Sequence, residues 1–292
     1  MRAGYGLDGT DSERVELGEG FLARLERFVA QARARATRED VGRGVMRGQG
    51  VELEGHRPYR SGEDLRDLDW ELLARLGQPW VRVRRAEQGE RVAIVLDTSA
   101  SMGVGSPSKL QLAAEVALAL TCASLEKGGS CVLLSHGEGG RVESFALRSA
   151  NARAAAIAWT ERRRARGSCR LAELLSDPSL RRAHRVVVLG DLMDVEPAEV
   201  LALAGRGRRV ELVQVLAERE LAPQATQGVE WIDPEGGASL QLEVGERVLR
   251  EYGSALDARF ERWRAACRGR GQVHRLARSD AAFEDVAGAL RP

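Results

Sequence analysis

The chain has 292 residues, of which 43% are hydrophobic and 30% are charged, and its formal net charge is +1. This length suits one large domain with an extension, and the balanced charge argues against a protein that binds nucleic acid or an anionic membrane surface. No window approaches the roughly 18 apolar residues of a membrane-spanning helix, so we expect no membrane insertion. The four cysteines form no C-x-x-C pair, so we expect free buried thiols and a cytoplasmic location.

The first predicted element is a helix from Leu17 to Ala36, because apolar residues recur there at three- and four-residue steps. The next informative stretch is residues 54–85, EGHRPYRSGEDLRDLDWELLARLGQPWVRVRR. Charges of alternating sign lead up to Trp70. This pattern favours a local network of charged side chains, with Trp70 anchoring the segment on the main domain. A surface for a partner protein is the alternative.

The stretch VAIVLDTSASM, from Val92 to Met102, organises the rest of the chain. Its unbroken apolar run predicts a strand buried on both faces, as in a parallel sheet covered by helices. Asp97, Ser99 and Ser101 follow at the carboxyl end of that strand, where ligands bind in such sheets. One carboxylate and two hydroxyls suit Mg²⁺ (or Mn²⁺) better than zinc or copper. An ordinary solvated turn fits the same pattern.

DTSASM resembles the first loop of a von Willebrand factor type A domain, which carries a metal-ion-dependent adhesion site written D-x-S-x-S. The resemblance implies a threonine in a second loop and an aspartate in a third. Ser168, after a helix predicted over 151–164, stands at the place of the threonine. Asp191, after the apolar strand from Arg185 to Gly190, is the expected aspartate, with Asp194 in reserve.

The remaining elements continue an alternation of strands and helices. Ser108 is a plausible N-cap for a helix running to Leu125. The other elements expected are strands over 131–135, 142–147, 210–216 and 272–277, two short strands within 229–244, and helices over 196–204, 245–268 and 281–290. Such alternation predicts an α/β fold with a doubly wound, mostly parallel sheet. We expect residues 1–90 to form an N-terminal segment packed on a main domain of residues 91–292.

The segment around Trp70 carries a second resemblance. It is similar to the signature Y-R-x-G-D-D-x-R-x-I-D-W-x-x-x-A-R of the bacterial domain-of-unknown-function family 58. The matching residues are Tyr59, Arg60, Gly62, Asp64, Arg66, Asp69, Trp70, Ala74 and Arg75. The departures are Ser61, Glu63 and Leu68, and none of them removes a charge or a large ring. Members of this family have a von Willebrand A-like fold and are associated with MoxR-type AAA+ ATPases.

The motifs of common enzyme classes are missing from the sequence. It has no G-x-x-x-x-G-K-[ST] loop, no H-E-x-x-H and no G-x-S-x-G. The leading hypothesis is therefore a non-enzymatic interaction module that works with a MoxR-type AAA+ ATPase and an acidic protein client. Its metal would be held by Asp97, Ser99, Ser101, Ser168 and Asp191, and a partner carboxylate would complete the coordination. The alternatives are a metal-dependent phosphoester hydrolase using Asp97 and a scaffold whose metal site is vestigial.

Overall fold

The protein is described by a computed structural model that covers residues 14–43, 52–59, 68–85, 89–268 and 272–290. Its centre is a six-stranded sheet with the order β10-β7-β6-β3-β4-β5. All neighbouring pairs in this sheet are parallel except β4 and β5. The strands of the sheet are β3 (Arg91–Leu96), β4 (Ser130–His136), β5 (Val142–Leu147), β6 (Arg185–Gly190), β7 (Arg209–Leu216) and β10 (Val273–Arg278).

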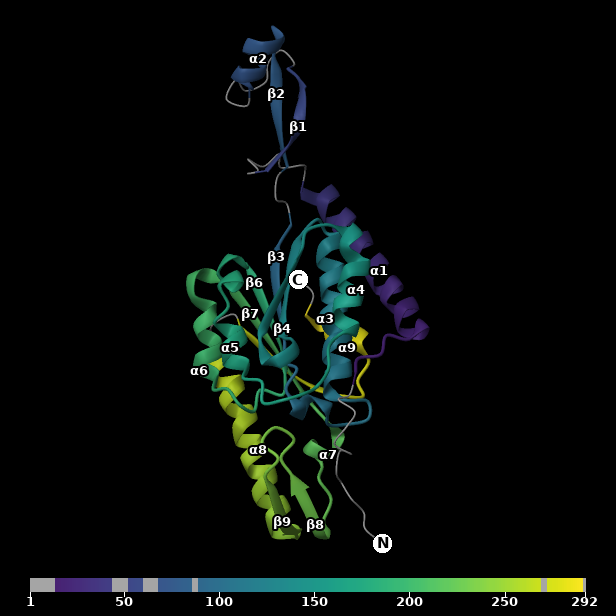
Figure 1. Cartoon of the computed structure of the whole chain (residues 1–292), viewed down its shortest axis with the longest axis vertical. Helices are drawn as coiled ribbons and strands as arrows, with labels where there is room; N and C mark the ends of the chain where they lie inside the picture. Colours follow the sequence, from purple (N-terminus) through teal and green to yellow (C-terminus); the bar gives the residue numbers. More distant parts are fainter. Residues whose placement is uncertain (1–13, 44–51, 60–67, 86–88, 269–271, 291–292) are drawn as a thin grey trace.

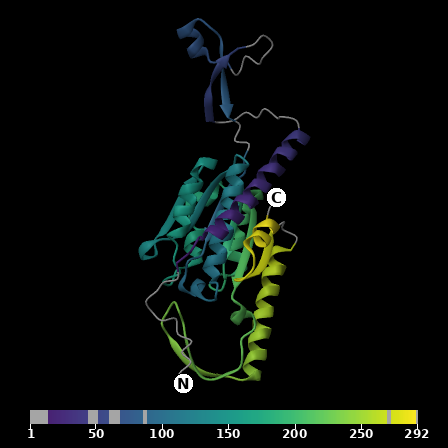
Figure 2. The ribbon, with the colours of Figure 1, turned by 90° about the vertical axis from the view of Figure 1, so that its right-hand side faces the viewer.

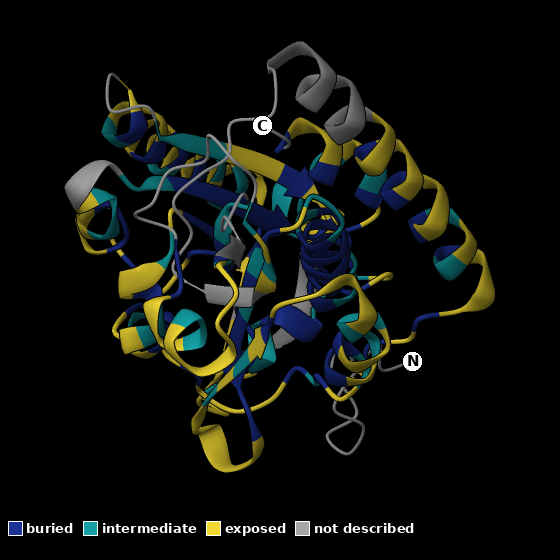
Figure 3. Cartoon of the chain, turned by 90° about the horizontal axis from the view of Figure 1, so that it is seen from above, coloured by how far each residue is buried: buried dark blue, intermediate teal, exposed yellow. Residues whose placement is uncertain are grey.

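Helices cover both faces of the sheet (Figures 1 and 2). One face packs on α1 (Glu19–Arg43), α3 (Lys109–Glu126), α4 (Arg153–Glu161) and α9 (Phe283–Ala289). The other face packs on α5 (Leu171–Leu175), α6 (Pro197–Leu201) and α8 (Glu246–Cys267). The buried residues gather in the middle of these layers, and the outer helices turn exposed faces to solvent (Figure 3). The predicted α/β fold with a doubly wound, mostly parallel sheet is therefore confirmed.

Strand β3 explains how one short apolar run joins the two layers. Successive side chains of a strand point to opposite faces of the sheet. Val92, Ile94 and Leu96 accordingly pack with α3 and its neighbours, whereas Ala93 and Val95 pack with α5 and α8. All five side chains are at most 3% exposed. Because β3 is central and covered on both faces, its carboxyl end is held rigidly at the edge of the sheet.

The N-terminal segment forms a small unit of its own, drawn at the top of Figure 1. Strands β1 (Glu52–Pro58) and β2 (Trp80–Arg85) pair antiparallel, and α2 (Trp70–Leu76) lies between them in sequence. Asp69 caps α2 by accepting the N–H groups of Glu71 and Leu72, each at 3.0 Å, and its other oxygen lies 2.7 Å from His56 Nε2.

The expected anchoring role of Trp70 is not seen among the described residues, because Trp70 lies on α2 and is 61% exposed. Residues 60–67 of the motif lie outside the described part of the chain. Asp69 contacts His56 and the first turn of α2, and the predicted network of charged side chains stays a prediction. The domain boundary near residue 90 stays a prediction.

A second hairpin projects at the opposite end of the molecule. Strands β8 (Thr226–Ile232) and β9 (Ser239–Val244) pair antiparallel, and β9 leads directly into α8. Figures 1 and 2 show this hairpin beside the lower end of α8, with its turn directed back toward the central sheet. The short helix α7 (Glu218–Leu221) connects β7 to β8.

A buried charge network lies at the amino-terminal edge of the central sheet. Arg185, at the start of β6, is 4% exposed and contacts Glu211 at 2.6 Å and Glu90 at 3.9 Å. Arg209 contacts Glu90 at 3.0 Å and Glu211 at 3.3 Å. Two arginines therefore balance two glutamates.

In the described chain, no helix is both long and apolar enough to cross a membrane.

Candidate functional site

The first loop of the site begins where β3 ends. The backbone N–H of Asp97 still donates to the carbonyl of Leu189 in β6 at 2.9 Å, so the residue is fixed as an extension of the sheet. Its side chain is 2% exposed, and its Oδ1 accepts the N–H of Ser99 at 2.9 Å. A short 3₁₀ helix at Ala100–Gly103 then turns the chain. This turn brings Ser101 back over the end of the sheet.

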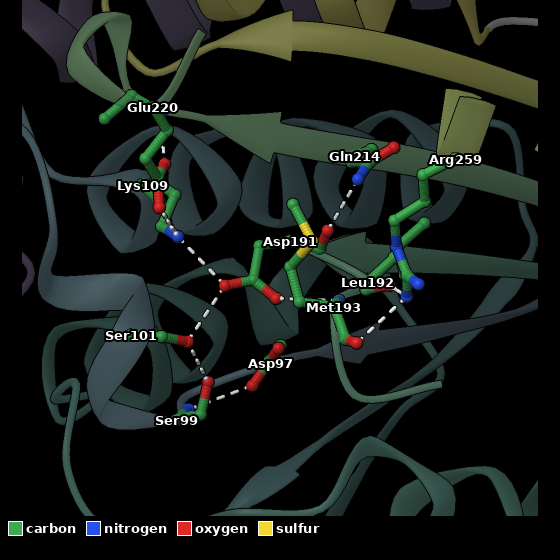
Figure 4. Close-up of polar contacts among 11 residues, drawn as sticks. Asp97, Ser99, Ser101, Lys109, Asp191, Leu192, Met193, Gln214, Glu220 and Arg259 are labelled. Atoms are coloured by element: carbon green, nitrogen blue, oxygen red, sulfur yellow. Dashed lines mark hydrogen bonds and ion pairs between the residues drawn. The ribbon is translucent and has the colours of Figure 1, made fainter. Parts of the chain in front are cut away.

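The third loop meets the first at the same edge. Ser101 Oγ donates to Asp191 Oδ2 at 2.9 Å, and the hydroxyl oxygens of Ser99 and Ser101 lie 3.0 Å apart. Asp191 is 4% exposed and follows β6, the strand next to β3. Figure 4 shows Asp97, Ser99, Ser101 and Asp191 directed toward one space. We call these four side chains the oxygen cluster.

The second loop borders the cluster through its backbone. The N–H of Ala100 donates to Gly167 O, and the N–H of Arg166 donates to Thr98 O, both at 3.0 Å. Ser168 therefore lies on a loop joined to the first loop. Its side chain is exposed, and no hydrogen bond among the described residues joins its hydroxyl to the oxygen cluster. Four of the five predicted ligands come together here, and the role of Ser168 stays a prediction.

Asp194 has a different contact from Asp191. Its Oδ2 accepts the N–H of Leu171 at 3.0 Å, at the start of α5. Burial is the largest cause of the raised pKa of Asp194, and the charge of Asp191 adds to it. Because the Asp194 carboxylate already accepts a backbone N–H at the start of α5, Asp191 is the better placed of the two aspartates for a ligand role.

Lys109 belongs to the site, although the sequence analysis assigned it no role. Its side chain is fully buried, and its Nζ donates to Asp191 Oδ2 at 2.9 Å and to Glu220 Oε1 at 2.7 Å. Burial opposes the charged form, but these two carboxylates raise the pKa of Lys109 above its usual value. The sequence did hold a signal: Lys109 is one of only two lysines in a chain with 44 basic residues.

The third loop has an unusual backbone conformation that α8 supports. Leu192 has a φ of 57°, in the left-handed region that a branched side chain rarely occupies. Arg259, on α8, donates to the backbone carbonyls of this loop. The acceptors are Leu192 O at 2.5 Å, Met193 O at 2.9 Å and Val195 O at 3.0 Å. The Arg259 guanidinium thus holds the loop that carries Asp191 (Figure 4).

A second support reaches Asp191 from the interior of the sheet. Gln214, on β7, is fully buried and donates from Nε2 to the carbonyl of Asp191 at 2.8 Å. Its Oε1 lies 3.0 Å from His274 Nε2 on β10, and the His274 ring stacks on Trp263 with centroids 5.7 Å apart. Burial lowers the pKa of His274 to about 4, so the ring is neutral at pH 7.

The surroundings of Asp97 disfavour its charged form. Burial, the largest cause, and the charge of Asp191 raise the pKa of Asp97 to about 8, against the opposing hydrogen bonds from Ser99. Lys109 neutralises Asp191, and no cation among the described residues contacts Asp97. The backbone of Gly190 lies against the Asp97 side chain. A Cβ at position 190 would lie only 2.8 Å from the Cβ of Asp97, so the absence of a side chain at Gly190 makes room for Asp97.

The oxygen cluster fits a hard divalent cation. Oxygen atoms at neighbouring corners of an octahedron around Mg²⁺ are about 3.0 Å apart, given Mg–O distances of about 2.1 Å. The spacings of 3.0 and 2.9 Å within the cluster match that separation. Only two members are carboxylates, and in the described chain no group of three or more His, Cys, Asp or Glu side chains is arranged to hold a metal.

A further carboxylate, Glu235, lies at the turn of the β8–β9 hairpin. The Ser101 and Ser99 hydroxyls act to lower its pKa. Burial, the largest cause, and the charges of Asp191 and Asp194 outweigh them, so the pKa of Glu235 is raised. The sequence analysis assigned the completing carboxylate to a partner and gave Glu235 no role.

Comparison of the sequence with known proteins identifies a matching family and a few relatives. The model of the family described as "Protein of unknown function DUF58" matches residues 55–262. Uncharacterized proteins of Mycobacterium bovis and Mycobacterium tuberculosis are 36% identical over 88 residues, which are 30% of this chain. This match spans only 27% of the length of those relatives.

Solved structures show weaker likeness. The conserved hypothetical protein BatB from Bacteroides thetaiotaomicron has a TM-score of 0.45 and 16% identity, over 69% of this chain and 95% of that chain. An aerotolerance-related membrane protein from Bacteroides fragilis has a TM-score of 0.41 and 15% identity, over 69% and 96%. The SpRpn10 VWA domain has a TM-score of 0.37 and 10% identity, over 70% and 96%.

Proposed function

The chain belongs to the DUF58 family, whose function is unknown, and from that premise we propose that it is a non-enzymatic interaction module that binds partners through a divalent metal ion. The observation that carries this proposal is the oxygen cluster. Two separate strand-end loops supply its four side chains, and the oxygen atoms of Ser99, Ser101 and Asp191 lie at spacings of 3.0 and 2.9 Å that suit Mg²⁺ or Mn²⁺.

The proposed ligands divide by charge. Ser99 and Ser101 hold the ion through neutral hydroxyls, and Asp97 and Asp191 contribute negative charge directly or through water. Lys109 already neutralises Asp191, so the ion keeps a net positive charge. The bound ion supplies an electrophilic centre for a carboxylate of another protein. Ser168, on the adjoining loop, is the proposed fifth ligand.

The proposed partners are a MoxR-type AAA+ ATPase and an acidic protein client, as the resemblance of the family motif implies. A partner Asp or Glu would bind the ion and couple the ATPase to its client. The four cysteines are unpaired and buried, which suits the reducing cytoplasm that we propose as the location.

The phosphoester hydrolase alternative has less support from the site. A nucleophilic carboxylate must reach the phosphorus atom of its substrate, but Asp97 is 2% exposed and accepts the N–H of Ser99. We therefore keep the interaction module as the proposal and use turnover as a control.

Thermal unfolding in Mg²⁺ tests the metal site directly. A ligand that binds only the folded state at about 100 times its Kd stabilises it by about 2.7 kcal/mol, which raises Tm by roughly 5–10 °C. We expect that shift in the wild type and none in Asp97→Ala. The matched control is Asp280→Ala, which removes an exposed aspartate paired with Arg278 and should keep the full shift. Equal shifts in the wild type and Asp97→Ala would contradict the site.

Co-purification tests the partner. The tagged chain should retain a MoxR-type ATPase from the same organism in Mg²⁺ but not in EDTA, and Asp97→Ala should lose it. Retention that is insensitive to both changes would refute metal-dependent binding. Metal-dependent turnover of a generic phosphoester, abolished by Asp97→Ala, would favour the hydrolase.

A further inference from the structure

We infer that the β8–β9 hairpin is a docking surface for a basic, extended segment of another protein, which adds to the hairpin as a third strand. The hairpin combines an apolar face, a free strand edge and an excess of acidic residues. This surface needs no metal ion. It is therefore independent of the oxygen cluster and of the partner proposed to bind there.

The strand register gives the hairpin one apolar face. Residues directly opposite each other in an antiparallel pair lie on the same face, and residues two apart along a strand share that face. Trp231 is paired with Leu240, and Val229 is paired with Leu242. Val244 lies two residues beyond Leu242 on β9. These apolar residues therefore share one face of the hairpin.

The apolar face is covered at the base of the hairpin and open at its tip. Val244, near the point where β9 contacts α8, is 6% exposed, whereas Leu240 is 60% exposed. Leu240 belongs to none of the buried apolar clusters of the described chain. Single exposed apolar residues are common on protein surfaces, but an apolar face that runs from a buried base to an open tip is a feature of interaction sites.

The hairpin also has a free edge. Strands β8 and β9 form a two-stranded sheet, with no third strand among the described residues. Because β9 leads into α8 and contacts it, the free edge is that of β8, on the side away from this helix (Figure 1). Strands that must stay unpaired usually carry lysine, proline or several charges. Strand β8, TQGVEWI, has one charged residue and no lysine or proline, so its edge is open to strand addition.

The charge of the hairpin favours a basic partner. Residues 226–244 contain four acidic residues and no lysine, arginine or histidine, in a chain with 44 basic and 43 acidic residues. No ion pair among the described residues neutralises Asp233, Glu235 or Glu243. A surface of this sign attracts a cationic segment and repels nucleic acid and anionic lipid. The complementary segment therefore carries lysine or arginine beside apolar residues.

A second copy of this chain is a poorer occupant of the same edge. Two β8 edges brought together would place the acidic residues of one hairpin beside those of the other. Like charges directly opposite each other destabilise a strand pair. The charge pattern therefore favours a different protein over self-association.

Synthetic peptides test the surface. The probe is a fluorescent peptide of about eight alternating lysine and valine residues, and the matched probe has glutamate in place of lysine. The full chain should bind the Lys–Val peptide in EDTA and should not bind the Glu–Val peptide. Affinity for the Lys–Val peptide should fall by about fivefold or more between about 0.05 and 0.5 M NaCl, because salt screens exposed charges. Equal binding of the two peptides, or binding of neither, would overturn the inference.

Two substitutions on opposite faces of the hairpin locate the contact. Leu240→Ser removes the exposed end of the apolar face and should weaken binding of the Lys–Val peptide by about tenfold. The matched control is Ile232→Ser, because Ile232 is 50% exposed but is paired with Ser239 on the other face. Both positions are exposed, so both variants should fold normally. An equal loss of affinity in the two variants, or a loss in neither, would contradict the docking face.

Backbone methylation of the peptide tests strand addition. A Lys–Val peptide methylated at its backbone nitrogens keeps its side chains and charges but has no N–H groups to donate to β8. Its affinity should be lower by about tenfold or more. The unmethylated peptide should slow amide hydrogen exchange at residues 226–232 by about fivefold. Binding that is insensitive to methylation, or protection that misses β8, would rule out a third strand.

Two measurements check the competing occupants. Sedimentation velocity should give the same oligomeric state for the wild type and Leu240→Ser, and a dimer lost in the variant would show that a second copy covers this face. Phosphatidylcholine vesicles should not retain the chain. Retention that depends on Leu240 would identify a lipid surface instead and would overturn the inference.

Discussion

At the amino-terminal edge of the central sheet, the buried Arg185 is paired with Glu211, whereas at the carboxyl edge the buried Asp97 lies beside a second carboxylate. Arg185, Arg209, Glu90 and Glu211 balance one another in sign. At the carboxyl edge, Lys109 faces Asp191 and Glu220, and burial together with the charge of Asp191 raises the pKa of Asp97 to about 8.

The comparison shows how a structural charge network differs from a candidate binding site in the same sheet. Buried charges that serve only the fold need partners within the fold, because an unpaired buried charge is costly. At the carboxyl edge, carboxylates outnumber the lysine that faces them, and the proposed metal ion would compensate this excess. Four substitutions test this distinction, taken from the largest expected effect to the smallest.

The largest effect is expected at the amino-terminal edge. Glu211→Gln leaves the buried Arg185 without its closest carboxylate, so the free energy of unfolding should fall by about 3–5 kcal/mol. Urea unfolding measures this change. The control is Arg209→Ala, since that side chain is 37% exposed and its loss should cost under about 1 kcal/mol. A cost for Glu211→Gln no larger than for Arg209→Ala would contradict a tightly coupled network.

Gly190→Ala tests how the sheet positions Asp97. The new Cβ would lie 2.8 Å from Asp97 Cβ and 2.9 Å from its Oδ2, so the carboxylate must move. We expect a loss of about 1–3 kcal/mol of stability from overpacking and a smaller Mg²⁺-induced rise in Tm. Gly253→Ala, on an open face of α8, should instead stabilise the protein by about 0.5–1 kcal/mol. An unchanged Mg²⁺ response in Gly190→Ala would disprove the positioning.

Asp97→Asn should stabilise the protein when EDTA removes divalent ions. The folded-state pKa of Asp97 is raised to about 8, so at pH 7 folding must protonate a side chain that is ionised in the unfolded state. This cost in stability shrinks as pH falls toward the unfolded pKa of about 3.9. We expect a gain of about 1–2 kcal/mol at pH 7, a smaller gain at pH 5, and no response to Mg²⁺. Destabilisation in EDTA at both pH values would show that Asp97 is a structural carboxylate.

The smallest effect concerns pH and His274. Its folded pKa is about 4, below the unfolded value of about 6.5, so the unfolded state binds protons first as pH falls. Stability from the neutral ring is therefore present above pH 6.5 and lost between pH 6.5 and 4, by about 1 kcal/mol after solvent screening. His274→Asn should have a flatter dependence of unfolding free energy on pH in that range. Some slope should remain, because burial also lowers the pKa of His136. An unchanged slope would contradict the assignment.

Much of the fold could be predicted from the sequence, because the spacing of apolar residues along the chain shows which face of a helix or strand is buried. The bounds expected for β5 and β6 are those observed, and Ser108 caps α3 by accepting the N–H of Gln111. The β1–α2–β2 unit was not predicted as strands and a helix. Its strand β1 contains a glycine and a proline, and charged residues interrupt the apolar pattern there, so periodicity gave no signal.

The oxygen cluster was predictable where a ligand follows directly on an apolar strand, as Asp97 and Asp191 do. Family membership confirms the resemblance drawn from the Trp70 motif. Lys109 and Arg259 were missed because each reaches the Asp191 loop across more than 60 residues of sequence. Such contacts depend on tertiary packing, which local patterns do not encode.

Helix α8 carries one more consequence. It starts at the foot of the β8–β9 hairpin, contacts α7 through Tyr252 and grips the Asp191 loop through Arg259. A helix of 22 residues is a rigid rod about 33 Å long. The same rod therefore carries both the hairpin and the side chain that holds the backbone at Leu192, so the position of the Asp191 loop is tied to the position of the hairpin base.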